Sequence, residues 1–163
     1  MKTIPVKMLN KLASIPMYVD DWDYEILKEK RWHILVSKIS KGGTRCNFYP
    51  ATTSKNISIL AHRIILWCPK GLQIDHIDGN PCNNQMSNLR VCTHSQNIQN
   101  RGKLSTNTSG YKGVSWHKRD KIWRAQIAVN GRYIYLGSFD TAKEAHKAYK
   151  NASIKYHGEF ASY

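Results

Sequence analysis

The sequence is short of acidic residues, and that shortage restricts the kind of partner it can bind. Its 163 residues contain 11 Asp and Glu against 25 Lys and Arg, which gives a formal charge of +14. Both halves of the chain are basic. An excess of this size is typical of proteins that bind polyanions, because each neutralised phosphate releases condensed counterions. A hydrophobic content of 41% indicates folded cores, so we expect a folded protein rather than a disordered one.

The chain also lacks long apolar runs and paired cysteines. No run reaches the roughly 18–20 residues of a membrane span, and Lys7, Asn10 and Lys11 interrupt any apolar signal core at the N-terminus. We therefore expect an intracellular, cytoplasmic protein with no membrane partner. No C-x-x-C pair is present, so we expect reduced structural thiols and no zinc at the four cysteines: Cys46, Cys68, Cys82 and Cys92.

Residues 1–56 are expected to form a small α+β scaffold. Residues 17–19 are typical of a short strand, and the acidic cluster in residues 20–25 suits a helix N-terminus, with an apolar face at Trp22, Ile26 and Leu27. Residues 31–37 and 44–49 are rich in aromatic and β-branched residues and flank two glycines. They predict a hairpin.

Residues 57–68 are nearly apolar and predict a strand followed by a short buried helix. Its apolar positions include Ile64, Ile65, Trp67 and Cys68, and Pro69 ends it. Two polar residues are embedded there: His62 and Arg63. They are either polar tips at a helix edge or phosphate contacts, and Arg63 is the stronger candidate because its planar fork suits phosphate.

Residues 72–101 predict a strand, a long loop, a second strand and a helix. Apolar and polar residues alternate over residues 72–77, as is typical of a strand. The Asp78-Gly79 pair is a strong turn signal because glycine accepts a positive φ. Residues 89–92 are expected to be the returning strand. Thr93 or Ser95 could cap a short helix that runs to residue 101.

This unit is unusually rich in asparagine, and the spacing of its polar residues is specific. The residues are Asp75, His76, Asp78, Gly79, Asn80, Asn83, Asn84, Asn88, Leu89, Arg90 and Asn97. The set resembles the HNH endonuclease motif with a ββα-metal fold. It is most similar to the phage and intron homing type, in which asparagine replaces the final histidine.

The chemistry of phosphodiester hydrolysis agrees with these residue types. A histidine near its ordinary pKa can take a proton from water, and a hard divalent cation held by oxygen ligands can stabilise the leaving oxygen. The resemblance implies His76 as general base, Asp75 and Asn97 as ligands of one Mg²⁺ or Mn²⁺, and Asn88 as the residue that ties the loop. Asn100 is the alternative second ligand, because it shares a helical face with Asn97. The other loop asparagines are expected to form turns.

Neighbouring strand residues point to opposite faces, so Asp75 and His76 should not share one direction. A bulge, or a base and a metal on two sides of the phosphate, would accommodate this. The sequence leaves both open.

Residues 102–109 are small and polar and predict a linker, followed by a three-stranded sheet and a helix in residues 110–163. An Asn130-Gly131 turn joins the last two strands, and Thr141 with Glu144 predicts a capping box. The segment resembles the plant Apetala/ethylene-response DNA-binding domain through YKGV at 111–114, WRAQI at 123–127, YLGSFDTA at 135–142, Glu144, Ala145, Ala148 and Tyr149.

That family lays its sheet in the major groove of DNA. The resemblance gives the DNA-facing role to Lys112, Ser115, His117, Gln126, Tyr133 and Tyr135, and strand alternation adds Arg124. The plant pattern has arginines where this chain has other residues, at Ser115, His117, Ala128 and Tyr133. The plant target sequence therefore does not carry over.

We therefore predict an α+β protein in four parts: a scaffold at 1–56, a nuclease core at 57–101, a linker at 102–109 and a DNA-binding domain at 110–163. Its expected function is homing-type cleavage of double-stranded DNA by a monomer or homodimer, with Arg63 and Arg90 as further DNA contacts. The alternative is a DNA-binding transcriptional regulator with an inactive nuclease core.

Overall fold

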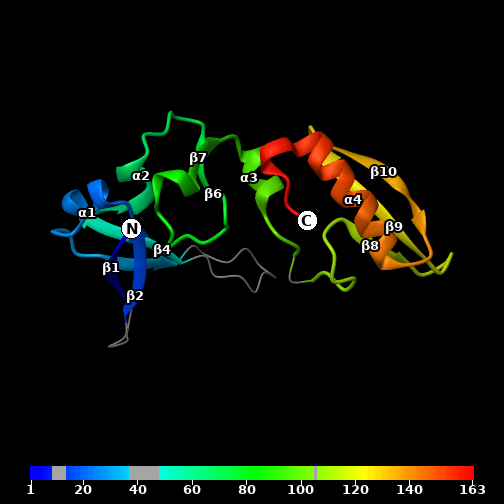
Figure 1. Ribbon diagram of the computed structural model, residues 1–163, viewed down its shortest axis with the longest axis horizontal. Helices are drawn as coiled ribbons and strands as arrows, with labels where there is room; N and C mark the ends of the chain where they lie inside the picture. Colours follow the sequence, from blue (N-terminus) through cyan, green and yellow to red (C-terminus); the bar gives the residue numbers. More distant parts are fainter. Residues whose placement is uncertain (9–13, 37–47, 105) are drawn as a thin grey trace. The chain divides into compact units, whose positions relative to one another are not determined.

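The computed structural model describes residues 1–8, 14–36, 48–104 and 106–163. Contacts within it divide the chain into two compact units, Met1–Cys92 and Thr93–Tyr163. Both units mix helices and strands, so the predicted α+β class is confirmed (Figure 1).

The first unit is built on a five-stranded sheet in the order β2-β1-β3-β4-β5. The parallel pair is β1 with β3, and the other neighbours are antiparallel. The strands are β1 (Lys2–Lys7), β2 (Ser14–Val19), β3 (His33–Val36), β4 (Phe48–Ser54) and β5 (Ile57–Leu60).

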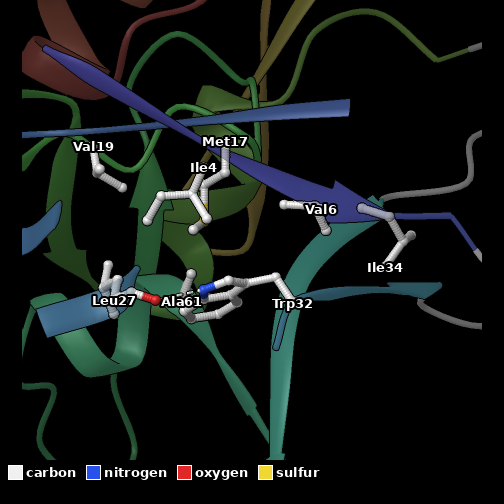
Figure 2. Packing of buried hydrophobic residues seen from close by; sticks show 8 residues of the cluster. All are labelled: Ile4, Val6, Met17, Val19, Leu27, Trp32, Ile34 and Ala61. Atoms are coloured by element: carbon white, nitrogen blue, oxygen red, sulfur yellow. Dashed lines mark hydrogen bonds between the residues drawn. The ribbon is translucent and has the colours of Figure 1, made fainter. Parts of the chain in front are cut away.

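Alternation along these strands places the core of this unit on one face of the sheet. Figure 2 shows strand side chains directed toward Leu27, at the end of α1 (Asp21–Leu27), and Ala61, at the start of α2 (Ala61–Ile65). The Trp32 indole lies beside them and donates a hydrogen bond from Nε1 to the Leu27 carbonyl at 2.9 Å. The buried strand residues in this cluster are Ile4, Val6, Met17, Val19 and Ile34.

Several expectations for this region need correction. The hairpin exists as β3 and β4, but its second strand runs over Phe48–Ser54 rather than ending at residue 49. The intervening residues 37–47 lie outside the described part of the chain. Trp22 and Ile26 are 87% and 62% exposed, so the apolar face predicted for α1 reduces to its last residue. The helix after β5 ends at Ile65, and Trp67 is exposed.

The strand, loop, strand and helix predicted for residues 72–101 are all present. β6 (Gln73–His76) pairs antiparallel with β7 (Leu89–Cys92), and a 3₁₀ turn, η1 (Met86–Asn88), precedes β7. The helix α3 (His94–Asn100) follows, capped by Thr93 in a capping box with Gln96. The division between the two units falls between Cys92 and Thr93, so α3 belongs to the second unit.

The second unit contains the sheet β10-β9-β8, formed by Val114–His117 (β8), Ile122–Val129 (β9) and Arg132–Phe139 (β10). The helix α4 (Ala142–His157) lies along one face of this sheet (Figure 1) and starts at the predicted Thr141–Glu144 capping box. Its residues Ala145, Tyr149 and Ala152 pack on the sheet in two small clusters. A short 3₁₀ turn, η2 (Gly158–Phe160), ends the element order.

Close packing in this unit depends on Gly113. Its φ is +70°, and a Cβ at this position would lie 2.1 Å from the ring of Tyr149. Glycine is therefore required both by the backbone conformation and by the approach of α4.

No helix in the part of the chain that the structure describes is both long and apolar enough to cross a membrane. Cys68, Cys82 and Cys92 are free thiols, and burial raises the pKa of Cys92 to about 11. Cys46 lies outside the described residues.

Candidate functional site

The loop between β6 and β7 is held by its own side chains. Asn88 accepts a hydrogen bond from the backbone N–H of Asp78 at 3.0 Å, and its Nδ2 donates to Asp78 Oδ1 at 2.9 Å and to the Asn83 carbonyl at 2.8 Å. Burial acts to raise the pKa of Asp78, but hydrogen bonds from Asn80, Asn83 and Asn88 outweigh it and lower that pKa. One end of the loop is thereby tied to the other.

The same loop brings an amide to the ring of His76. Asn84 is fully buried, and its Oδ1 lies 3.3 Å from His76 Nε2. The Asn84 Nδ2 donates to the Pro81 carbonyl at 3.1 Å, which fixes the orientation of the amide. Because Oδ1 can only accept, this hydrogen bond is made by the tautomer in which Nε2 carries the proton, and in that tautomer the basic lone pair is on Nδ1.

Aromatic rings surround His76 on another side. The His62 ring meets it edge to face at a centroid distance of 5.2 Å, and the Tyr49 ring lies 6.4 Å away. Burial lowers the pKa of His76, while the Asn84 hydrogen bond and the Asp78 and Asp75 carboxylates oppose that shift. The lowered pKa favours the neutral imidazole, which is the form that can accept a proton.

Asp75 has different neighbours from His76, as strand alternation predicts. It pairs across the sheet with Arg90, whose Nε and Nη2 donate to Asp75 Oδ2 at 3.0 and 2.8 Å. Both side chains are largely buried, at 7% and 12% exposure. The Arg90 guanidinium offsets the free-energy cost of burying the Asp75 carboxylate. Because Arg90 is itself buried, little of its surface is exposed for contact with a phosphate.

The donor set here suits a hard cation better than a soft one. Among the described residues, no three or more His, Cys, Asp or Glu side chains are grouped to hold a metal ion. A carboxylate such as that of Asp75, and amide oxygens, are the ligand types that Mg²⁺ takes, because Mg²⁺ keeps several waters and binds substrate phosphates. In their chemistry these ligand types would suit Mg²⁺ or Mn²⁺.

The N-terminal sheet also holds the loop. Asp20, directly after β2, accepts hydrogen bonds from Gln85 Nε2 at 3.2 Å and from the Met86 N–H at 2.8 Å. The Tyr18 backbone bonds to Cys82 and to Asn84, each at 2.8 Å. The scaffold thus supports the residues that surround His76.

In the second unit, the predicted DNA-facing positions that lie in strands share one face of the sheet. Ser115 lies opposite Arg124, and Gln126 lies opposite Tyr135, so these side chains point the same way. Ala125 and Ile127 are buried on the other face, beneath α4. Tyr133 and Tyr135 are 74% and 60% exposed on the strand at the sheet edge.

Several of the predicted contacts already have partners. Asp120 lies 3.1 Å from His117 Nδ1 and 2.8 Å from Arg124 Nη2. The Lys112 ammonium donates to the Gln99 carbonyl at 2.6 Å, and burial lowers the pKa of Lys112 to about 8. Arg63, in the first unit, is exposed on α2.

The sequence did not predict that Asn84, His62 and Tyr49 lie beside the His76 ring, although His62 was a candidate phosphate contact. Asn84 was expected to form a turn, as do Asn80 and Asn83, whose side-chain oxygens accept from backbone N–H groups two residues on. Two consecutive asparagines were a usable signal, since one turn needs only one of them. His62 carried no comparable signal, because its contact with His76 is made by the fold.

Comparison of the sequence with known proteins shows which families it matches. A family model described as an HNH endonuclease matches residues 67–99, and an AP2 domain model matches residues 109–159. Protein 3.8 of Escherichia phage T7 is 38% identical over 95 residues, which cover 58% of this chain and 78% of that protein. The chain belongs to the HNH endonuclease family, with an added AP2 domain.

Other relatives match the HNH and AP2 parts to different extents. The uncharacterized HNH endonuclease L560 of Acanthamoeba polyphaga mimivirus is 32% identical over 94 residues, covering 58% of this chain and 48% of that protein. APETALA2-like protein 2 of Oryza sativa subsp. japonica is 43% identical over 51 residues, covering 31% of this chain and 12% of that protein. This chain thus spans less than half the length of each of these two relatives.

Proposed function

We propose that this protein is a homing-type DNA endonuclease that hydrolyses a phosphodiester bond with one divalent cation and with His76 as general base. The observation that supports the proposal is the buried His76 imidazole, which is hydrogen-bonded to Asn84 and whose pKa is lowered by burial. In the tautomer that donates from Nε2 to Asn84, Nδ1 is the basic atom. In the reaction Nδ1 takes a proton from water as the water oxygen bonds to phosphorus and the bond to the leaving oxygen breaks.

Asp75 and Asn97 would hold the cation, with Asn100 as the alternative to Asn97. When bound, Mg²⁺ or Mn²⁺ supplies charge stabilisation to the phosphate and the leaving oxygen. Arg90 orients the Asp75 carboxylate through its two hydrogen bonds. The role of the chain in this part of the site is to place oxygen ligands and neutralise their charge.

The sheet of the AP2 domain is proposed to bring double-stranded DNA to the protein. Its exposed face offers Ser115, Gln126, Tyr133 and Tyr135, together with His117 and Arg124. Arg63 would add a phosphate contact from the first unit. Tethering a binding domain to a nuclease raises the effective concentration of the nuclease at its target.

Plasmid cleavage tests the proposal. Supercoiled plasmid carrying the DNA that flanks the gene is incubated with wild type, His76→Ala or His94→Ala, in Mg²⁺, Mn²⁺ or EDTA. We expect metal-dependent nicking or linearisation by wild type and by the exposed-histidine control, and a loss of about 10²-fold or more in His76→Ala. DNA affinity and circular dichroism of the His76 variant verify that it remains folded.

Two outcomes would contradict the proposal in different ways. Undiminished cutting by His76→Ala would remove His76 as the base. Tight DNA binding without any cutting by wild type would instead favour the regulator with an inactive nuclease core. Whether the product is nicked or linear separates action on one strand by a monomer from action on both by a dimer.

A further inference from the structure

The segment that follows α3 makes hydrogen bonds to other parts of the second unit. Lys103 Nζ donates to the Gly110 carbonyl at 3.0 Å, and Asn107 Nδ2 donates to the Tyr111 carbonyl at 2.7 Å. The Ser109 hydroxyl contacts the Val114 carbonyl at 2.9 Å. Ser105 lies outside the described residues. The described part of this segment is therefore attached to the turn before β8 and, through Ser109, to β8 itself.

Lys112 lies two residues before β8 and connects this part of the AP2 domain directly to α3. Its Nζ donates to the Gln99 carbonyl at 2.6 Å, and its side chain is half-buried. Gln99 lies in the last turn of α3, where carbonyl groups lack donors from their own helix. An ammonium group there satisfies a carbonyl and interacts favourably with the negative end of the helix dipole.

A pocket beside this contact is lined by the same three elements. It has a volume of about 430 Å³ and is lined by Ile98 of α3, by Leu104 of the following segment and by sheet positions that include Ser115, Gln126 and Tyr133. The pocket therefore borders α3, the segment that follows α3 and the proposed DNA-facing surface. A second contact within this unit joins α3 to η2.

We propose that Lys112 is a positioning residue that fixes α3 to the DNA-binding sheet, rather than a phosphate contact. Because α3 carries Asn97, this contact would fix the position of the proposed ligand relative to DNA bound on the sheet. The consequence for cleavage rests on the proposed nuclease function, whereas the anchoring of α3 does not.

The test compares Lys112→Met and Lys112→Arg in the full-length chain. Lys103→Met is the matched control, because Lys103 also donates to a backbone carbonyl, but to that of Gly110 and not to one of α3. Three quantities are measured: amide exchange of residues 94–100, DNA affinity as a function of salt, and the single-turnover cleavage rate. Arginine keeps a donor at position 112, so it tests whether the hydrogen bond is what matters.

In Lys112→Met we expect amide exchange in α3 to rise and cleavage to fall, each by about tenfold or more, with DNA affinity and its salt slope unchanged. Lys112→Arg should restore most of both, and Lys103→Met should leave α3 exchange as in wild type. A salt slope lower by about one identifies a phosphate contact and overturns the proposal. Unchanged α3 exchange in Lys112→Met also overturns it. If wild type does not cut, the nuclease proposal fails, but exchange and affinity still decide the role of Lys112.

Discussion

At the scale of single residues, the proposed base depends on an uncharged amide. Asn84 is completely buried, and its two side-chain atoms are both used: Nδ2 toward Pro81 and Oδ1 toward His76. This arrangement selects one tautomer of the imidazole. Without it, the proton could occupy Nδ1, and the ring would present an N–H where a base is needed.

Asn84→Ala should therefore lower cleavage without lowering DNA affinity. We expect the single-turnover rate to fall by at least about tenfold, since the tautomer is no longer fixed. The matched control is Asn80→Ala, which removes an asparagine from an exposed turn of the same loop. Wild-type cleavage by a folded Asn84→Ala protein would show that the amide does not orient the base.

At the scale of elements, the loop between β6 and β7 is clamped from outside as well as from within. Asp20 has no capping hydrogen bond to α1, although it stands at the N-cap. Its two carboxylate oxygens instead bind Gln85 and Met86, 65 and 66 residues further along the chain. A residue that looks like a helix cap in the sequence thus serves the nuclease loop.

Asp20→Ala should loosen this loop. We expect a loss of about 1–2 kcal/mol in unfolding free energy, because two charge-assisted hydrogen bonds are removed at a partly exposed site. Amide exchange in residues 77–88 should rise as well. Asp21→Ala is the control: Asp21 is 69% exposed and pairs with the terminal amine. Equal effects of the two substitutions on the loop would contradict a clamp by Asp20.

Local patterns predicted most elements that carry function. The β6–β7 unit, the Thr93 cap and the sheet with α4 follow from turns, caps and alternation, which act over a few residues. The β1 strand was not predicted, although its antiparallel partner β2 is the next strand along the chain. The Asp20 clamp and the His62–His76 contact were not predicted because their partners lie far apart in the sequence. Long-range packing, unlike periodicity, leaves no local trace in a single sequence.

At the scale of the whole molecule, the buried His62 makes stability depend on pH. Burial, with the nearby His76 and Arg63, lowers the pKa of His62 from 6.5 to about 3. Above pH 6.5 both folded and unfolded states are neutral at this residue, so its full contribution is present. Below pH 6.5 the unfolded chain binds a proton that the folded chain refuses until about pH 3.

Unfolding free energy should therefore fall by up to about 1.4 kcal/mol per pH unit from this residue as the pH drops below 6.5. His62→Phe keeps a ring against Tyr49 and His76 but cannot titrate. Its acid slope, measured by denaturant unfolding between pH 7 and pH 4, should be shallower than that of wild type. Parallel slopes for the two proteins would rule out His62 as the source.

The strand β2 lies at the edge of the five-stranded sheet, where unpaired backbone groups are a template for aggregation. At Tyr18 the N–H and the carbonyl on the outer side are taken by Cys82 and Asn84, through a parallel bridge to Asn83. The loop that holds His76 thus also shields a sheet edge from other chains. Substitutions that release the loop would then reduce solubility as well as activity, and selection on either property would preserve both.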